Sequence, residues 1–124
     1  VLRFAREAQA ASAVDTAHVP HGWESRLLFE ETTRTLFCGD LFTHTGNGPA
    51  ATHGDIVGPA RAAEEIFHAS CLTPTTGAVI RKLSEFAPTT LAVMHGSSFN
   101  GDVRRALHDL ADFYDGLHRA AAGG

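Results

Sequence analysis

The sequence predicts a single α/β domain in which a mixed β-sheet carries helices on one face. Three observations indicate this fold. Short apolar runs of β type alternate along the chain with segments whose apolar residues recur at helical spacing. The 124 residues are about one domain's length, and a composition of 44% hydrophobic and 19% charged residues is ordinary for a globular protein. No internal repeat or linker divides the chain, so residues 1–124 are expected to form one unit.

The first part of the chain predicts a short helix, a loop and a hairpin. Residues 1–12 have alanines spaced among charges, which is a weak helical pattern. A proline and a glycine make residues 18–22 a loop. Two runs of β type follow at 26–31 and 34–38, about a turn apart, and predict a hairpin.

The second part predicts one long loop, three helices and one strand. Residues 44–59 are rich in glycine and proline, and a loop of this length in a compact domain is usually functional or disordered. Further on, we expect a helix after Pro74, an apolar strand over 89–94 and a C-terminal helix with an apolar stripe. The helix beginning at Pro59 is expected to bury Ala63, Ile66 and Phe67 and to expose Glu64 and Glu65.

Charge, hydropathy and cysteine use exclude several classes of protein. The net charge of −4 argues against a protein that binds a phosphate backbone. No apolar run approaches the roughly 20 residues that cross a bilayer. Cys38 and Cys71 form no CxxC pair and lie beside apolar residues, which favours buried free thiols in a reducing compartment. We therefore expect a cytoplasmic protein that binds neither nucleic acid nor membrane.

Histidine is abundant, with eight in the chain, and polar residues follow the predicted strands. His21 lies in the loop before the hairpin, Asp40 follows the second hairpin strand, and His95 follows the apolar strand. Open α/β sheets build their sites just past strand ends, and imidazole and carboxylate are ligands of zinc and non-haem iron. The pattern predicts a metal site of His21, Asp40 and His95. Taken singly, each residue has the simpler interpretation of a turn residue or a helix cap.

Three segments carry a resemblance to a known family. They are His21-Gly22-Trp23-Glu24-Ser25, Leu36-Phe37-Cys38-Gly39-Asp40-Leu41-Phe42 and Met94-His95-Gly96. In order and context they resemble the C-terminal half of a metallo-β-lactamase-fold metallo-hydrolase, closest to the branch related to the β-lactamase-like domain of flavodiiron proteins. The resemblance covers roughly residues 14–120. It implies one half of a four-layered αββα sandwich, with His21 on one metal ion, His95 on the other and Asp40 bridging them.

One part of the family pattern is absent. The family's first ligand cluster, His-x-(His/Glu)-x-Asp-His, starts at none of the histidines here, and the chain has about half the usual length of the fold. For the intact relative the resemblance implies a metal-dependent hydrolase, or a flavodiiron-like oxidoreductase, with two zinc or iron ions. For this chain it implies a fragment or a natural truncation with weak or absent metal and no activity alone.

The alternative is a non-catalytic scaffold without a working metal site. The strands carry consecutive apolar residues, such as Leu27, Leu28 and Phe29, which point alternately to opposite faces. Helices on one face leave the other uncovered, so the expected partner is a second copy of the chain or the missing N-terminal half.

The remaining candidates have open interpretations. His18 is an outer-sphere partner of the site, an alternative ligand or an exposed loop residue, while His44 and His53 lie in the long loop that would border the site, with either a functional role or none. Trp23 either lines the pocket or is a residue that packs in the interior of the domain. Ser97-Ser98 lacks the strand-elbow-helix pattern of a nucleophile. The three histidines on predicted helices are expected at the surface: His68, His108 and His118.

Overall fold

The computed structural model describes residues 11–123 and has the predicted α/β architecture. Its elements in order are β1 (Ala11–Asp15), β2 (Arg26–Glu30), β3 (Thr35–Phe37), β4 (Ala51–Thr52), α2 (Val57–Phe67), α3 (Thr76–Leu83), the 3-10 turn η1 (Ser84–Phe86), β5 (Thr90–Ala92), β6 (Ser98–Asn100) and α4 (Val103–Gly123). The helix expected over residues 1–12 lies outside the described residues, except that 11–12 begin β1.

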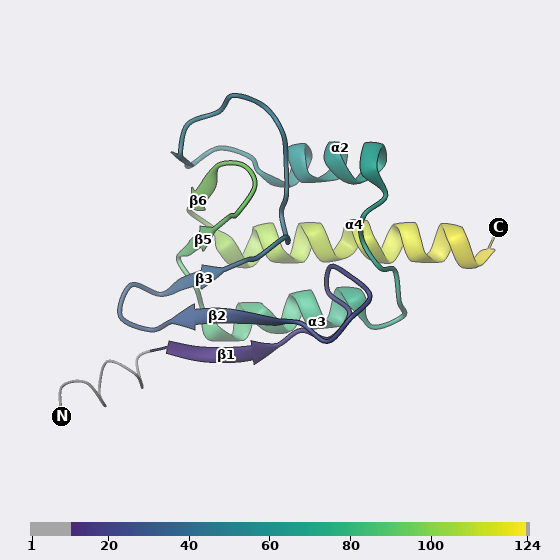
Figure 1. Cartoon of the computed structure of the whole chain (residues 1–124), viewed down its shortest axis with the longest axis horizontal. Coiled ribbons are helices and arrows are strands. Elements are labelled where there is room, and N and C mark those ends of the chain that lie inside the picture. The colour runs from purple at the N-terminus through teal and green to yellow at the C-terminus, as the bar shows by residue number, and fades with distance from the viewer. Residues whose placement is uncertain (1–10, 124) are drawn as a thin grey trace.

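The strands form one mixed sheet in the order β1-β2-β3-β5-β6-β4 (Figure 1). β1, β2 and β3 pair antiparallel in sequence, which confirms the predicted hairpin of β2 and β3. β5 then adds parallel to β3, and β6 turns back antiparallel to β5. Because two antiparallel steps separate β1 from β3, the strands β1, β3 and β5 all run in one direction. Their carboxyl ends therefore meet at one edge of the sheet.

One face of the sheet is buried under helices. Leu27, Phe29, Leu36 and Leu91 alternate with less buried positions along their strands, as the period of two requires. α3 and α4 lie behind the sheet in Figure 1, and α2 packs against α4. The helix side of the core is supplied by an apolar stripe at helical spacing: Ile80 and Leu83 of α3 with Val103, Leu107 and Leu110 of α4.

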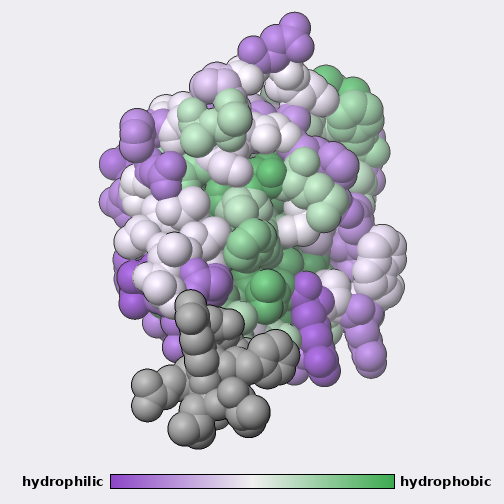
Figure 2. Space-filling view, turned by 60° about the vertical axis from the view of Figure 1, so that its left-hand side comes forward, coloured by the Kyte–Doolittle hydropathy of each residue, from purple (hydrophilic) through white to green (hydrophobic). Residues whose placement is uncertain are grey.

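The opposite face of the sheet keeps apolar side chains in solvent. Leu28 and Phe37 are cross-strand partners and are 44% and 45% exposed. Ala13 and Ala92 continue the same row on the neighbouring strands. A space-filling view shows apolar groups gathered in a band between hydrophilic ones (Figure 2). We call the row Ala13–Leu28–Phe37–Ala92 the open face.

Helix α2 follows the predicted pattern at Ala63 and Glu65 and contradicts it at Glu64, Ile66 and Phe67. It buries Ala60, Ala63 and Glu64, whereas Ile66 and Phe67 are 67% and 59% exposed. The small side chains let α2 approach α4, and Glu64 is tolerated inside because Ser70 provides hydrogen bonds to it. Sequence periodicity predicted that Ile66 and Phe67 are buried, because the periodicity does not show that Ser70 can satisfy a buried Glu64.

Two short strands were also unexpected. β4 interrupts the predicted long loop, and β6 lies between the predicted strand over 89–94 and the C-terminal helix. Both are two or three residues long and contain polar side chains, so neither gives a strand pattern in sequence. Among residues 11–123, no helix is both long and apolar enough to cross a membrane.

Candidate functional site

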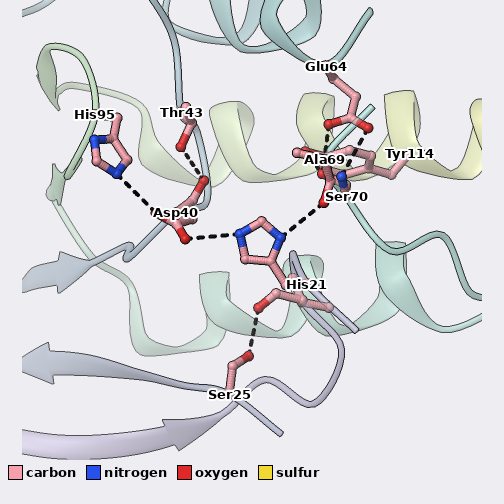
Figure 3. A network of polar contacts seen from close by, with 10 residues as sticks. His21, Ser25, Asp40, Thr43, Glu64, Ala69, Ser70, His95 and Tyr114 are labelled. Atoms are coloured by element: carbon pink, nitrogen blue, oxygen red, sulfur yellow. Dashed lines mark hydrogen bonds and ion pairs between the residues drawn. The ribbon is translucent and has the colours of Figure 1, made fainter. Parts of the chain in front are cut away.

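Three loops bring the predicted ligands together at the edge where β1, β3 and β5 end. His21 belongs to the loop after β1, Asp40 follows β3, and His95 follows β5. His21 Nε2 lies 2.9 Å from Asp40 Oδ2, and His95 Nε2 lies 3.3 Å from Asp40 Oδ1. The three side chains point toward one another (Figure 3). The predicted convergence of these residues is confirmed as geometry.

Asp40 is the centre of the group because each of its carboxylate oxygens faces a different imidazole. The turn that carries it is held locally, since the Thr43 hydroxyl donates to the Asp40 carbonyl at 2.6 Å. Gly39 precedes it with φ +55°, a left-handed conformation that glycine adopts without strain. The side chain is 38% exposed, so the carboxylate is accessible from solvent.

His21 has hydrogen-bond acceptors at both ring nitrogens. Nδ1 lies 3.0 Å from the carbonyl of Ala69, and Nε2 lies 2.9 Å from Asp40 Oδ2. A carbonyl and an ionised carboxylate accept but cannot donate. The ring therefore satisfies both contacts only as a doubly protonated imidazolium, or with a cation in place of the Nε2 proton. Trp23 stacks on this ring, with centroids 4.6 Å apart.

A cavity of about 300 Å³ extends from the three residues between α2 and α4. Its wall is largely apolar, with Pro20, Ala60, Ala63 and Phe67 among its lining residues. At its polar end, Ser70 Oγ lies 2.9 Å from Glu64 Oε2 and 3.0 Å from the Tyr114 hydroxyl.

Tyr114 keeps its proton at neutral pH. Burial raises the pKa of its phenol to about 12, against a smaller opposing effect of the Ser70 hydrogen bond. The cavity thus has an acidic and histidine-rich end and a second end with Glu64, Ser70 and a neutral phenol. Glu64, Ser70 and Tyr114 were not predicted from sequence, since they lie on three separate segments with no shared motif.

The side chains of His21, Asp40 and His95 are of the types that bind metal ions, but they supply few donor atoms for each ion. Imidazole nitrogen and carboxylate oxygen suit zinc and non-haem iron. Within residues 11–123, no three side chains of His, Cys, Asp or Glu are placed as a set that could hold a single ion. Two ions that shared Asp40 would each have two protein donors, one imidazole and one carboxylate oxygen.

The other candidate residues differ in where they lie relative to the group of His21, Asp40 and His95. His44 borders the group, since its backbone amide donates to the His95 carbonyl at 2.8 Å. The side chain of His18 is exposed, and the His53 ring bonds to the Asn100 carbonyl at 2.9 Å. Trp23 is 58% exposed and covers the His21 ring.

The helical histidines differ from expectation at two positions. His108 is half-buried, with Nε2 3.4 Å from the Ser84 hydroxyl, where an exposed side chain was expected. His118, in α4, is half-buried as well, whereas His68 follows α2 in a left-handed conformation and is exposed as expected.

Comparison with known proteins gives matches in structure alone. No family model and no curated protein matches the chain. Two solved structures of the chemotaxis sensor ODP are similar to it. One, of a peroxy diiron species, has a TM-score of 0.65 and 16% identity, and covers 86% of this chain and 44% of that chain. The other, the apo state from T. denticola, has a TM-score of 0.64 and 16% identity, with coverages of 86% and 43%. The chain thus shares the α/β fold of these structures and spans less than half of their length.

Proposed function

We propose that His21, Asp40 and His95 are one half of a dinuclear metal centre, and that the chain corresponds to the C-terminal half of a metallo-β-lactamase-type protein. Asp40 would bridge the two ions, with His21 on one and His95 on the other. Iron is favoured over zinc because a structural neighbour was solved as a peroxy diiron species. The reaction class of the complete centre would be metal-assisted hydrolysis or iron-based redox chemistry.

A single observation carries this proposal: two imidazole Nε2 atoms approach the two different oxygens of one carboxylate. His21 adds to it, because its Nδ1 faces a carbonyl and leaves Nε2 directed at an anion. A cation at that position replaces a proton and keeps every contact of the ring. A hydrogen bond from Nδ1 to a carbonyl is also the usual way in which a metal-binding imidazole is oriented.

The chain's own residues would have distinct parts in such a centre. The Ala69 carbonyl fixes the orientation of His21, and the Thr43 hydroxyl fixes the turn that carries Asp40. The apolar wall of the cavity limits water beside the site, and the Tyr114 hydroxyl is the neutral donor at its far end. When bound, the metal would supply Lewis acidity or electrons. With two protein donors per ion, we expect weak metal binding and no turnover by this chain alone.

Metal titration of the purified chain tests the proposal. Zinc, and ferrous iron without oxygen, are added while the histidine ring resonances are followed by NMR. We expect the His21 and His95 rings to respond together, the metal to be lost on dialysis, and generic esters and lactams to remain intact. Asp40→Asn should weaken binding by more than about 100-fold, beyond what loss of an outer-sphere partner costs. His21→Ala should remove half of the response.

His53→Ala is the matched control, because this exposed loop histidine has a single backbone partner. It should bind metal like the unmodified chain. Stoichiometric metal that survives dialysis, together with hydrolysis of an ester or lactam, would contradict the two-donor site. Absence of any response of His21 and His95 at millimolar metal would instead support a non-catalytic scaffold.

A further inference from the structure

We propose that His44 is a positioning residue that fixes the loop carrying His95, an inference that rests on the proposed metal centre. His44 lies four residues after Asp40, in the segment that leaves β3. Its backbone amide donates to the His95 carbonyl at 2.8 Å. His44 therefore connects the segment that carries Asp40 to the loop that carries His95.

The His44 ring makes a second and a third connection. Nδ1 lies 2.8 Å from the Phe42 carbonyl, and Nε2 accepts a hydrogen bond from the Ser97 amide at 2.9 Å. A carbonyl can only accept and an amide N–H can only donate. The ring must then be neutral with its proton on Nδ1, and neither nitrogen is left for a metal. His44 thus acts on the site through the backbone of the 95–97 loop.

Gly96 shows how closely the ring fits under this loop. Gly96 has φ +128°, a conformation that side chains rarely adopt. A Cβ at this position would lie 2.4–2.5 Å from three atoms of the His44 ring. The glycine therefore allows the loop to close over the imidazole, and the ring fills the space that a side chain would take.

His95 depends on this support because its own side chain has little packing. It is 58% exposed, and its neighbour Met94 is 65% exposed. The buried neighbour is Ser97, whose amide meets His44 and whose hydroxyl donates to the Pro49 carbonyl. The orientation of His95 toward Asp40 is thus set by the anchoring of its loop.

The two imidazoles that face Asp40 are held independently. His21 is oriented by the Ala69 carbonyl, and His95 by the clamp of His44 and Ser97. Loss of His44 should therefore disturb His95 and leave His21 in place. A residue with a general structural role would disturb both.

Histidine-detected NMR and zinc titration test the inference with three variants. In the unmodified chain His44 should show the Nδ1–H tautomer alone, before and after zinc. His44→Ala should shift the His95 ring resonances without zinc, leave those of His21 unchanged, and weaken zinc binding about 10- to 100-fold. His44→Gln should restore part of the affinity, because an amide can both donate to Phe42 and accept from Ser97. His53→Ala should change nothing.

The outcomes separate this inference from the proposed function. If zinc moves neither His21 nor His95 in the unmodified chain, the metal centre is wrong, while the metal-free shift of His95 still decides the role of His44. An Nε2–H tautomer of His44 would overturn the clamp without any variant, even if His44→Ala fails to fold. Unchanged His95 resonances in a folded His44→Ala chain would overturn it as well.

Discussion

The two faces of the sheet differ in what covers them. On one face, Leu36 is fully buried against the stripes of α3 and α4. On the other, its sequence neighbour Phe37 pairs with Leu28 and remains nearly half exposed. Apolar side chains lie on both faces of these strands, although the open face also carries polar ones such as Arg26 and Thr35, and the described chain covers one face.

This difference shows where the stability of the fold comes from and where a partner would act. The buried face joins the strands to the helices and holds the strand ends whose loops carry the candidate site. The open face contributes little to that framework. Its apolar row is a typical surface for association, since soluble monomers rarely expose contiguous apolar patches.

The largest expected effect is on the buried face. Leu36→Ala should lower the free energy of unfolding by about 2–5 kcal/mol, because it removes fully buried methyl groups and leaves a cavity. Phe37→Ala is the matched control one residue away and should cost about 1 kcal/mol or less. Urea unfolding measures both. Equal losses would show that the two faces are equally packed in solution.

The second effect concerns the open face. At micromolar concentration we expect the chain to exceed its monomer mass of 13.2 kDa in light scattering. The double variant Leu28→Ser with Phe37→Ser should reduce it to a monomer, because polar groups at the centre of the row remove the apolar area that a second copy would bury. A clean monomer mass for the unmodified chain would contradict self-association through this face.

The part of the site that could be predicted depends on recognising the strands in the sequence. Strand runs are visible in sequence as apolar segments, and a polar residue just past each run falls at a sheet edge. Asp40 and His95 could therefore be predicted to meet, whereas His21 was joined to them as a residue of the loop before the hairpin and through the family resemblance. The prediction succeeded because β1, β3 and β5 run in one direction.

The rest of the site depends on contacts between segments without local pattern. Glu64 was expected outside because charge alone favours exposure, but Ser70, six residues later, satisfies it inside. The role of His44 depends on its contact with the 95–97 loop. The Ser97 amide that donates to the His44 ring lies 53 residues away in the sequence. The nearest sequence signal is Gly96 after His95, which indicates close approach but does not identify what approaches.

A third test compares a buried thiol with a half-buried one. Cys38 follows β3 and is part of the core, and its burial raises the pKa of its thiol to about 12, so it has almost no thiolate at pH 8. Cys71 is half-buried in the loop before α3. We expect a thiol reagent at pH 8 to modify one cysteine in the folded chain and two in urea. Cys71→Ser should leave none reactive when folded, and rapid modification of Cys38 would show that the core opens readily.

The smallest effect on stability is expected from Glu30, the last residue of β2, beside the turn of the β2–β3 hairpin. Hydrogen bonds from the Thr33 hydroxyl, and from the amides of Thr33 and Thr32, lower the pKa of its carboxyl from 4.5 to about 2. A depressed pKa in the folded state means that the charged form stabilises the hairpin above about pH 4.5, and that this contribution is lost as the pH falls toward 2.

Glu30→Gln should therefore unfold at a slightly lower urea concentration than the unmodified chain at pH 7, and at the same concentration near pH 2. Because the carboxyl is surrounded by solvent, the loss at pH 7 should be well below that of Leu36→Ala. Glu31→Gln is the matched control, since this neighbouring carboxyl is exposed beside the same turn. A difference between Glu30→Gln and the unmodified chain that persists unchanged at pH 2 would show that the Glu30 side chain acts through its shape and not through its charge.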